Sequence, residues 1–405
     1  MPPFPRFASS IRRRRWLTWL ASLPLAPVSG CGGGNSINTS GLSTGGTGSF
    51  TNGTVNGLGS IIVNSIRYDD SQAHVQHSDG SAAASTFKLG MVVTVEGSTI
   101  TGSISAGTAT ATATRISYDS EWIGPVDSID TTASTFTVLG NTVSVSSTTV
   151  WDGSGVNELA RLNTTHWVEV YGYLNTATPI LQATRVEVCT RSPGAYKLSG
   201  LITNLRHDRC TLGALTLRYV QSQADVPLSE GLLVRAQLAT QPDGAKRWPV
   251  TRVQVLDQLL SDLDVSEAQE AELKGRITAY RSVTDFSVNG LVIDASGVSG
   301  IGALGLTRGS SIEVKGVVSQ GVVVASDVAL LQDHDNENES FELHGPLTAI
   351  NTSAKTFSLR GYTLHHTDAT TFELDGADWV VGLRVEVKAR QQSGLWYALK
   401  VEVDS

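Results

Sequence analysis

Hydrophobic and polar residues alternate along most of the chain in short runs, and glycine or a polar turn separates each run from the next. Examples are MVVTVEG from Met91, HWVEVYG from His166 and SIEVKGV from Ser311. Strict alternation places one face of a strand on a core and the other in water. The pattern therefore predicts an all-β protein of short, half-buried strands.

The same order of strands recurs five times. The copies open with a glycine followed two residues later by an aliphatic residue, at Gly53, Gly124, Gly200, Gly275 and Gly345. A hairpin with a tight turn at Leu-Gly or Asn-Gly, an alternating strand and a closing A-x-x-V segment follow. A period of about 70–75 residues indicates tandem domains of one type.

Five strands in one such copy would leave two bare sheet edges, which favour aggregation. We therefore expect each copy to close into a small five-stranded β-barrel. The predicted organisation is a signal peptide at 1–30, a flexible tether at 31–52, barrels at 53–121, 122–196, 197–258, 272–332 and 341–405, an acidic linker or short helix at 259–271 and an acidic linker at 333–340.

The pattern G-x-V … F-x-V-x-G-x-x-V … G-x-x-V-x-V-x-G … A-x-x-V resembles the domain-of-unknown-function family numbered 5666, which occurs as repeats in bacterial envelope lipoproteins. The resemblance extends over residues 53–404. It implies a small β-barrel, with the OB-like type as one form, and it implies no activity. The third copy departs from the pattern at Ala236 and Leu238, and the first has a weaker hairpin, IIVNSIRYDD from Ile61.

The N-terminal segment predicts export. Four arginines at 12–15 precede an apolar stretch at 16–25, which is typical of a secretory signal and too short to span a membrane. The sequence VSGC ending at Cys31 resembles a lipobox, which implies that Cys31 is acylated and becomes the new N-terminus. Gly32 in place of Asp then favours the outer membrane. The alternative is an ordinary signal peptide, and the arginines leave the Sec and twin-arginine routes open.

The mature chain is acidic. The first thirty residues carry five arginines and no acidic residue, so their removal takes the net charge from −8 to −13. Phosphate backbones repel such a body, and nucleic acid is therefore excluded here as a partner. The lipid bilayer, reached through Cys31, and an envelope protein or glycan are the partners we expect.

One acidic run is a metal candidate. Asp333, Asp335 and Glu337 alternate like the first ligands of a calcium loop, but the turn glycine and the final glutamate of such a loop are missing. We therefore interpret the run as a solvated linker and expect no cofactor, with weak calcium binding as the alternative.

Histidine and hydrolase chemistry give weaker signals. His74 and His77, and His365 and His366 with Asp368, do not recur between copies, so we expect surface or turn positions. The sequence has no G-x-S-x-G, H-E-x-x-H or phosphate-binding glycine loop. The chain is therefore predicted not to be an enzyme.

Two cysteines remain beyond the lipobox. Cys189 ends the second copy and Cys210 begins the hairpin of the third. In an oxidising envelope a bridge between them would close a loop of about 20 residues and contribute roughly 3 kcal/mol in the chain-entropy model. We predict this disulfide, with two separate thiols as the alternative.

The six tryptophans beyond the signal offer either packing or sugar stacking. Trp248 and Trp396 each lie five residues before the closing valine of their copy, Val253 and Val401. A repeated register favours core packing. The sequence as a whole predicts a non-catalytic, lipid-anchored envelope scaffold or adhesion module, with a small-ligand or calcium receptor as the alternative.

Overall fold

The computed structural model describes residues 48–78, 81, 83, 86–153, 155–224, 226–256, 269–331 and 340–404. Predictions for the signal peptide, Cys31 and the acidic run at 333–337 lie outside these residues. The described part is all-β, as predicted. Its helical segments are three short 3₁₀ turns, η1 (Leu159–Arg161), η2 (Gln221–Gln223) and η3 (Ile301–Leu304).

The second repeat shows how each barrel closes. Its strands are β7 (Trp122–Asp130), β8 (Thr135–Val138), β9 (Asn141–Ser144), β10 (Val150–Asp152), β11 (Trp167–Asn175) and β12 (Ile180–Cys189). Strands β7, β8 and β9 form an antiparallel meander, β9 pairs in parallel with β12, and β11 joins β12 back to β7. This closed five-stranded order is OB-like. The short β10 pairs with β12 as an addition.

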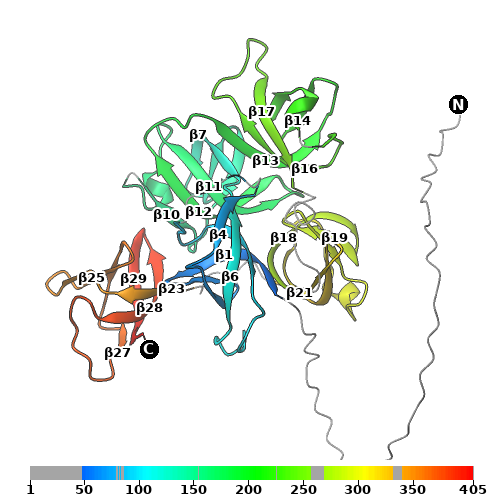
Figure 1. Ribbon diagram of the computed structural model, residues 1–405. Helices are drawn as coiled ribbons and strands as arrows, with labels where there is room; N and C mark the ends of the chain where they lie inside the picture. Colours follow the sequence, from blue (N-terminus) through cyan, green and yellow to red (C-terminus); the bar gives the residue numbers. More distant parts are fainter. Residues whose placement is uncertain are drawn as a thin grey trace, which may run out of the picture. The chain divides into compact units, whose positions relative to one another are not determined.

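The same pairing order closes the other four barrels. Figure 1 shows their strands coloured along the chain. Barrel 1 has β1 (Ser49–Leu58), β2 (Ile61–Val63), β3 (Ile66–Asp69), β4 (His74–His77), β5 (Val92–Gly97) and β6 (Thr110–Tyr118). Barrel 3 has β13 (Tyr196–Thr203), β14 (Arg209–Leu212), β15 (Leu215–Arg218), β16 (Leu233–Leu238) and β17 (Trp248–Val255). Barrel 4 has β18 (Glu270–Ser282), β19 (Asp285–Val288), β20 (Leu291–Asp294), β21 (Ser311–Ser319) and β22 (Val322–Leu330). Barrel 5 has β23 (Phe341–Pro346), β24 (Ala349–Asn351), β25 (Thr356–Leu359), β26 (Tyr362–His365), β27 (Thr371–Glu373), β28 (Arg384–Gln392) and β29 (Leu395–Val403).

The repeated glycines have two structural causes. In barrels 1, 2, 4 and 5 the tight turn between the second and third strands places both central residues at positive φ, as in Leu139 (51°) and Gly140 (72°), which is the geometry of a two-residue hairpin. In the turn of barrel 3 only Gly213 has a positive φ (55°). The opening glycine of a repeat lies against that same hairpin. A Cβ on Gly275 would lie 2.1 Å from Asn289 Nδ2, so this position requires glycine.

The alternating strands bury one face, as the sequence predicts. In barrel 2, for example, Val126, Phe136, Val170 and Val186 are at most 2% exposed and pack together. The tryptophans also pack. Trp122, Trp151 and Trp396 are buried, and Trp167, Trp248 and Trp379 are partly buried against the cores. Packing is therefore the main role of the tryptophans in the described residues.

Two predicted boundaries are corrected. Strand β1 begins at Ser49, inside the predicted tether, because Ser49–Asn52 pair with β5 on one side and with β18 on the other. Strand β18 begins at Glu270, so the last two residues of the predicted linker at 259–271 are extended. The rest of that linker, up to residue 268, lies outside the described residues.

Strand β1 also joins repeats that are distant in sequence. Residues Ser49–Asn52 pair in parallel with Glu270–Leu273 of barrel 4, and Gly57 and Leu58 pair in parallel with β23 of barrel 5. In most repeat proteins each unit contacts only its neighbours in sequence. Barrel 1 instead contacts the fourth and fifth repeats through backbone pairing.

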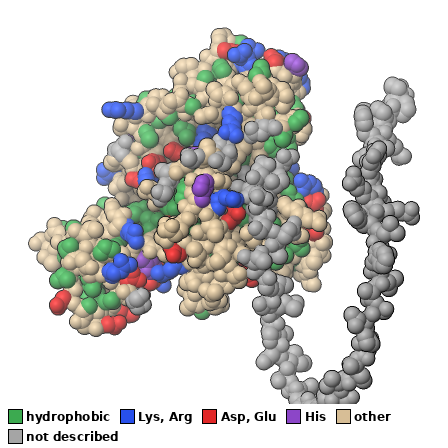
Figure 2. Space-filling view, in the orientation of Figure 1, with side chains coloured by type: hydrophobic (Ala, Val, Ile, Leu, Met, Phe, Trp, Pro, Cys, Tyr) green, Lys and Arg blue, Asp and Glu red, His purple; other side chains and the backbone are tan. Residues whose placement is uncertain are grey.

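Charge is dispersed over the surface. Figure 2 shows basic and acidic side chains in small separate groups on the face in view, amid a large uncharged area. In the residues that the structure describes, no helix has the length and apolar character needed to cross a membrane.

Candidate functional site

One surface recurs at the same backbone register in every barrel, and we call it the docking face. It is the outer surface of the first, fourth and fifth strands of a barrel. Residues that pair across these three strands form two rows of three positions. One row starts at the residue directly before the opening glycine of the repeat, and the other starts three residues before it. In barrel 5 the rows are His344–Glu386–Glu402 and Glu342–Lys388–Lys400.

Each barrel has its own residues in these rows. In barrel 3 they are Ser199–Arg235–Gln254 and Lys197–Gln237–Arg252. In barrel 4 they are Lys274–Glu313–Ala329 and Glu272–Lys315–Asp327. In barrel 2 they are Ile123–Glu169–Glu187 and the pair Tyr171–Arg185. In barrel 1 they are Asn52–Thr94–Ser117 and Phe50–Glu96–Arg115. The backbone register is thus shared, while the charge pattern differs from barrel to barrel.

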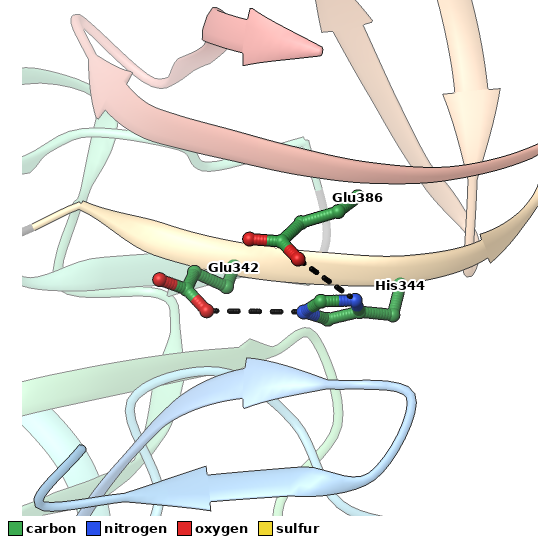
Figure 3. A group of neighbouring side chains, drawn as sticks. All are labelled: Glu342, His344 and Glu386. Carbon is green, nitrogen blue, oxygen red and sulfur yellow. Dashed lines mark ion pairs between the residues drawn. The ribbon is translucent and has the colours of Figure 1, made fainter. Parts of the chain in front are cut away.

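The docking face of barrel 5 holds the strongest metal candidate (Figure 3). Glu342, His344 and Glu386 have ligand atoms within 4.8 Å of one another and are the one such group of three among the described residues. His344 is 1% exposed, with Nε2 3.8 Å from Glu342 and Nδ1 3.6 Å from Glu386. Asp404 lies 3.5 Å from Nδ1. The hydrogen bond to His344 lowers the pKa of Glu342.

A side chain of barrel 1 already supplies a cation to this group. The guanidinium of Arg67 lies 2.8 Å from Nε2 and 3.2 Å from Nδ1 of His344, and 3.5 Å from Glu386. A metal ion bound to either ring nitrogen would have to displace Arg67. The arrangement is therefore that of an ion-pair junction between barrels 1 and 5.

The docking face of barrel 2 also forms an ion-pair junction with barrel 1. Arg185 is fully buried and donates to the carbonyl of Leu89 in barrel 1 at 3.1 Å and to the carboxylates of Asp152 and Glu187. Lys88 of barrel 1 lies 2.9 Å from Glu187. Because a buried guanidinium needs compensating acceptors, these contacts hold barrel 1 against barrel 2 in a defined register.

The docking face of barrel 4 buries a carboxyl group. Glu272 is 3% exposed, and its Oε1 lies 3.7 Å from Lys315 Nζ. Burial, together with the neighbouring Glu313, raises the pKa of Glu272 to about 8. Strand β1 pairs with β18 at this residue, with Thr51 opposite Glu272.

The residues singled out in the sequence do not assemble into one site. Asp333, Asp335 and Glu337 lie outside the described residues, and so does Cys31. His74 is exposed, and His77 lies 3.4 Å from Asp119. Neither predicted histidine pair forms a metal group within the described part of the chain.

His365 and His366 of barrel 5 lie among aromatic side chains. The ring of His366 is tilted against Phe357 and lies edge-on to Phe372, and the ring of His365 is tilted against Tyr397. Asp368 pairs with Lys355.

The predicted disulfide between Cys189 and Cys210 is corrected by the structure, in which both are free thiols. Cys189 is exposed at the end of β12, whereas Cys210 is 4% exposed and belongs to the hydrophobic core around barrel 3. Burial raises the pKa of Cys210 to about 11. The two thiols therefore occupy different environments, one in water and one inside a barrel.

Sequence reasoning missed the docking-face residues, above all His344, Glu342 and Glu386. A signal for two of them was available. Aligning the copies on their opening glycine places His344 and Glu342 of the fifth copy in register with Ser199 and Lys197 of the third. Alternation alone places these residues on the outer face of the strand, which fits water as well as a neighbouring barrel.

The model of the family described as "Domain of unknown function (DUF5666)" matches residues 123–187, 274–329 and 344–402. These three segments are DUF5666 domains. They correspond to barrels 2, 4 and 5, which are thereby tandem repeats of this family. Barrels 1 and 3 share the fold and the docking-face register but lie outside the matched segments.

No curated protein matches the chain. Among solved structures, a Drosophila Unr chain described as CSD456 matches with 15% identity over 53% of this chain and 98% of its own, at a TM-score of 0.13. A multidomain protein with nucleic acid binding domains from Streptococcus pneumoniae matches with 10% identity over 52% of this chain and 73% of its own, at a TM-score of 0.12.

These matches correct one prediction. The acidic charge of the chain was taken to exclude nucleic acid, but one matched protein is described by its nucleic acid binding domains, so the exclusion was wrong. Both TM-scores are far too low to carry an argument about the partner of this chain. Net charge alone therefore removes no class of partner here.

Proposed function

We propose that this chain is a non-catalytic scaffold of the bacterial cell envelope, anchored by lipid at Cys31, in which barrel 1 holds four further barrels for a protein or glycan partner. The observation that carries the proposal is the use of the docking faces. Barrel 1 contacts the docking-face strands of the other four barrels, and the described residues belong to one compact unit.

Barrel 1 contributes a different contact to each docking face. Arg67 lies against His344 of barrel 5, and Lys88 lies 2.9 Å from Glu187 of barrel 2. The carbonyl of Ser78 accepts a hydrogen bond of 3.0 Å from Gln254 of barrel 3, and β1 pairs with β18 of barrel 4. Four different contacts from one barrel support a central structural role for it.

The proposal leaves the exposed positions on the second and third strands of barrels 2 to 5 for a partner. Other residues of these strands already meet a neighbouring barrel, as Asn141 of β9 and Tyr362 of β26 do. In OB-type barrels this surface and its adjoining loops bind extended ligands, oligosaccharides among them. In barrel 5 these strands are β25 and β26, and Thr363 of β26 is exposed. Fixing several such surfaces in one body raises the effective concentration of each for a repetitive polymer.

Site-specific photocrosslinking in intact cells tests the proposal. A photoreactive residue is placed at Thr363, once in the wild-type chain and once in a Cys31→Ala chain, and incorporation of an alkyne fatty acid is measured in parallel. We expect fatty-acid labelling and a discrete protein or glycan adduct with the wild-type chain. The Cys31→Ala chain should show neither.

Two outcomes contradict the proposal. If Cys31→Ala retains fatty-acid labelling, the lipid anchor at this residue is wrong. If the wild-type chain is labelled but gives no adduct from Thr363 or from a second photoreactive position at Ser358 on β25, the partner surface is wrong.

A further inference from the structure

A cavity of about 580 Å³ lies between barrels 2 and 3 and opens to solvent. Its walls come from β7 and the β8–β9 turn of barrel 2, and from β13, the β14–β15 turn, the segment after β16 and the start of β17 of barrel 3. The volume lies within the roughly 300–1,000 Å³ of ordinary small-molecule sites. The junction of these two barrels therefore has room for a ligand.

One side-chain amide joins the two turns that border the cavity. Asn141 of β9 donates from Nδ2 to the carbonyl of Leu139 at 2.7 Å, and its Oδ1 accepts a hydrogen bond of 2.8 Å from the backbone nitrogen of Ala214. A Cβ on Gly213 would collide with Asn141 Oδ1, so glycine permits this close approach. The cavity is thus held open by protein contacts, which lowers the cost of ordering it around a ligand.

Aromatic side chains supply the apolar wall. The rings of Tyr196 and Trp248 are 6.0 Å apart between centroids and are tilted by 47°. Trp167 Nε1 donates to the hydroxyl of Tyr196 at 3.3 Å, which fixes the tyrosine ring. Tyr196 is buried, whereas Trp248 is half-buried. The part of the indole that packing leaves uncovered is an apolar surface on the cavity.

Polar side chains lie at the rim, and their charge restricts the ligand. Asp127 is the one charged side chain among the described residues that line the cavity, and Thr240 and Gln241 add a hydroxyl and an amide. Asp127 Oδ2 accepts a hydrogen bond of 2.6 Å from the backbone nitrogen of Gly140, which orients the carboxylate and leaves its second oxygen able to accept another. A carboxylate without a cation beside it in the wall repels anionic ligands.

We propose that this cavity binds an uncharged sugar unit of a glycan, with an apolar face of the sugar ring on Trp248 and its hydroxyl groups hydrogen-bonded to Asp127 and Gln241. Proline-rich peptides also bind aromatic grooves, but proline has no N–H to donate to Asp127, whereas each sugar hydroxyl is a donor. The inference deepens the proposed function, on which it rests for a glycan as the partner, and it does not depend on lipid at Cys31.

Isothermal titration calorimetry of the full chain, in a detergent without a sugar headgroup, tests the site. The neutral probes are maltotriose, cellotriose and triacetylchitotriose, and the contrasting probes are inorganic phosphate and decaproline. We expect at least one trisaccharide to bind, with an affinity that added salt leaves unchanged because the ligand carries no charge. Phosphate and decaproline should not bind.

Two variants locate the binding. Trp248→Ala should weaken it about tenfold by removing the apolar contact with the ring. Trp379→Ala, which removes another half-buried tryptophan in barrel 5, is the matched control and should bind like the wild type. Gln241→Ala covers a failure of Trp248→Ala to fold, because Gln241 is exposed, and should weaken binding roughly fivefold. Its control is Gln392→Ala, at an exposed glutamine of barrel 5.

The proposal is overturned if none of the three trisaccharides binds, or if phosphate or decaproline binds and Trp248→Ala removes that binding. It is also overturned if folded Trp248→Ala or Gln241→Ala binds like the wild type, or if either control loses as much. An adduct from Thr363 in a chain that binds no trisaccharide would reject this site and keep the proposed function. Trisaccharide binding without an adduct would reject the partner surface around Thr363 and keep this site.

Discussion

The docking faces of barrels 5 and 3 have the same backbone register and opposite chemistry. In barrel 5 a cation, Arg67, lies among the carboxylates of Glu342, Glu386 and Asp404 beside His344. In barrel 3 an anion, Asp119, lies among basic side chains. In both cases a residue from outside the barrel provides the opposite charge. A repeated fold can thus specify different neighbours by changing the charges on one surface.

The two inserted residues differ in burial. The side chain of Arg67 is 35% exposed, whereas that of Asp119 is 8% exposed. Removing one partner of a buried ion pair leaves the others without compensation, while solvent screens a partly exposed pair. The comparison therefore predicts a much larger loss of stability at barrel 3 than at barrel 5.

The largest effect is expected at Asp119. Asp119→Ala removes the carboxylate that pairs with both Lys197 and Arg235, while Glu121 still pairs with Arg235. We expect a loss of about 3 kcal/mol in the free energy of unfolding. Chemical denaturation of the full chain, followed by tryptophan fluorescence, measures it. Asp378→Ala, at an exposed position of barrel 5, should change stability by no more than about 0.5 kcal/mol.

The pH dependence of Asp119 gives a second measure of the same contact. Its pKa in the folded chain lies below the ordinary 3.8, so its contribution to stability is complete above about pH 4 and falls as the pH decreases further. Asp119→Asn should reduce this loss of stability at low pH. If Asp119→Ala is as stable as Asp378→Ala at pH 7, or if Asp119→Asn loses stability at low pH like the wild type, then Asp119 does not hold barrel 3.

A smaller effect is expected at Glu272 on the docking face of barrel 4. Burial favours the neutral form of this carboxyl group. The pKa of Glu272 is raised from 4.5 to about 8, so the folded chain binds a proton that the unfolded chain lacks between these values. Stability should therefore fall as the pH rises from about 5 to 8, by about 1–3 kcal/mol. Thermal unfolding of the full chain over this range checks the slope.

Glu272→Gln removes the titrating group and keeps its shape. We expect the variant to match the wild type at pH 5 and to lose the slope between pH 5 and 8. Glu373→Gln is the control, because Glu373 is an exposed glutamate of barrel 5 paired with Lys400. A slope that persists in Glu272→Gln would assign the pH dependence to another group.

Much of the fold was predictable, and the docking faces were not. The period of the opening glycines and the Leu139-Gly140 type of turn reflect local geometry, which leaves a trace in the sequence. The contact of Arg67 with His344 joins residues 277 positions apart. Its formation depends on how two barrels meet, and alternation in each strand gives no information about that.

The same reasoning explains the individual errors. The disulfide prediction used the separation of Cys189 and Cys210 along the chain and an oxidising envelope, whereas the burial of Cys210 in a barrel core decides its neighbours. The tether was extended to residue 52 because Gly, Ser, Thr and Asn dominate residues 32–52, with a strand in its last few residues as the alternative. Pairing on both edges makes them a strand, and one of those partners, β18, lies more than 200 residues away.

The smallest effect on stability is expected at Arg67, the cation on the docking face of barrel 5. Arg67→Ala should cost only about 1 kcal/mol, because its ion pairs are partly exposed. It should also free Glu342, His344 and Glu386, whose ligand atoms lie within 4.8 Å of one another, to bind a zinc ion. We therefore expect Zn²⁺ to raise the unfolding temperature of Arg67→Ala and to leave that of the wild type unchanged.

Arg384→Ala removes an exposed arginine paired with Asp404 but keeps Arg67, so it should gain no such response. A zinc response in Arg384→Ala, or none in Arg67→Ala, would show that Arg67 is not the cation that completes this face.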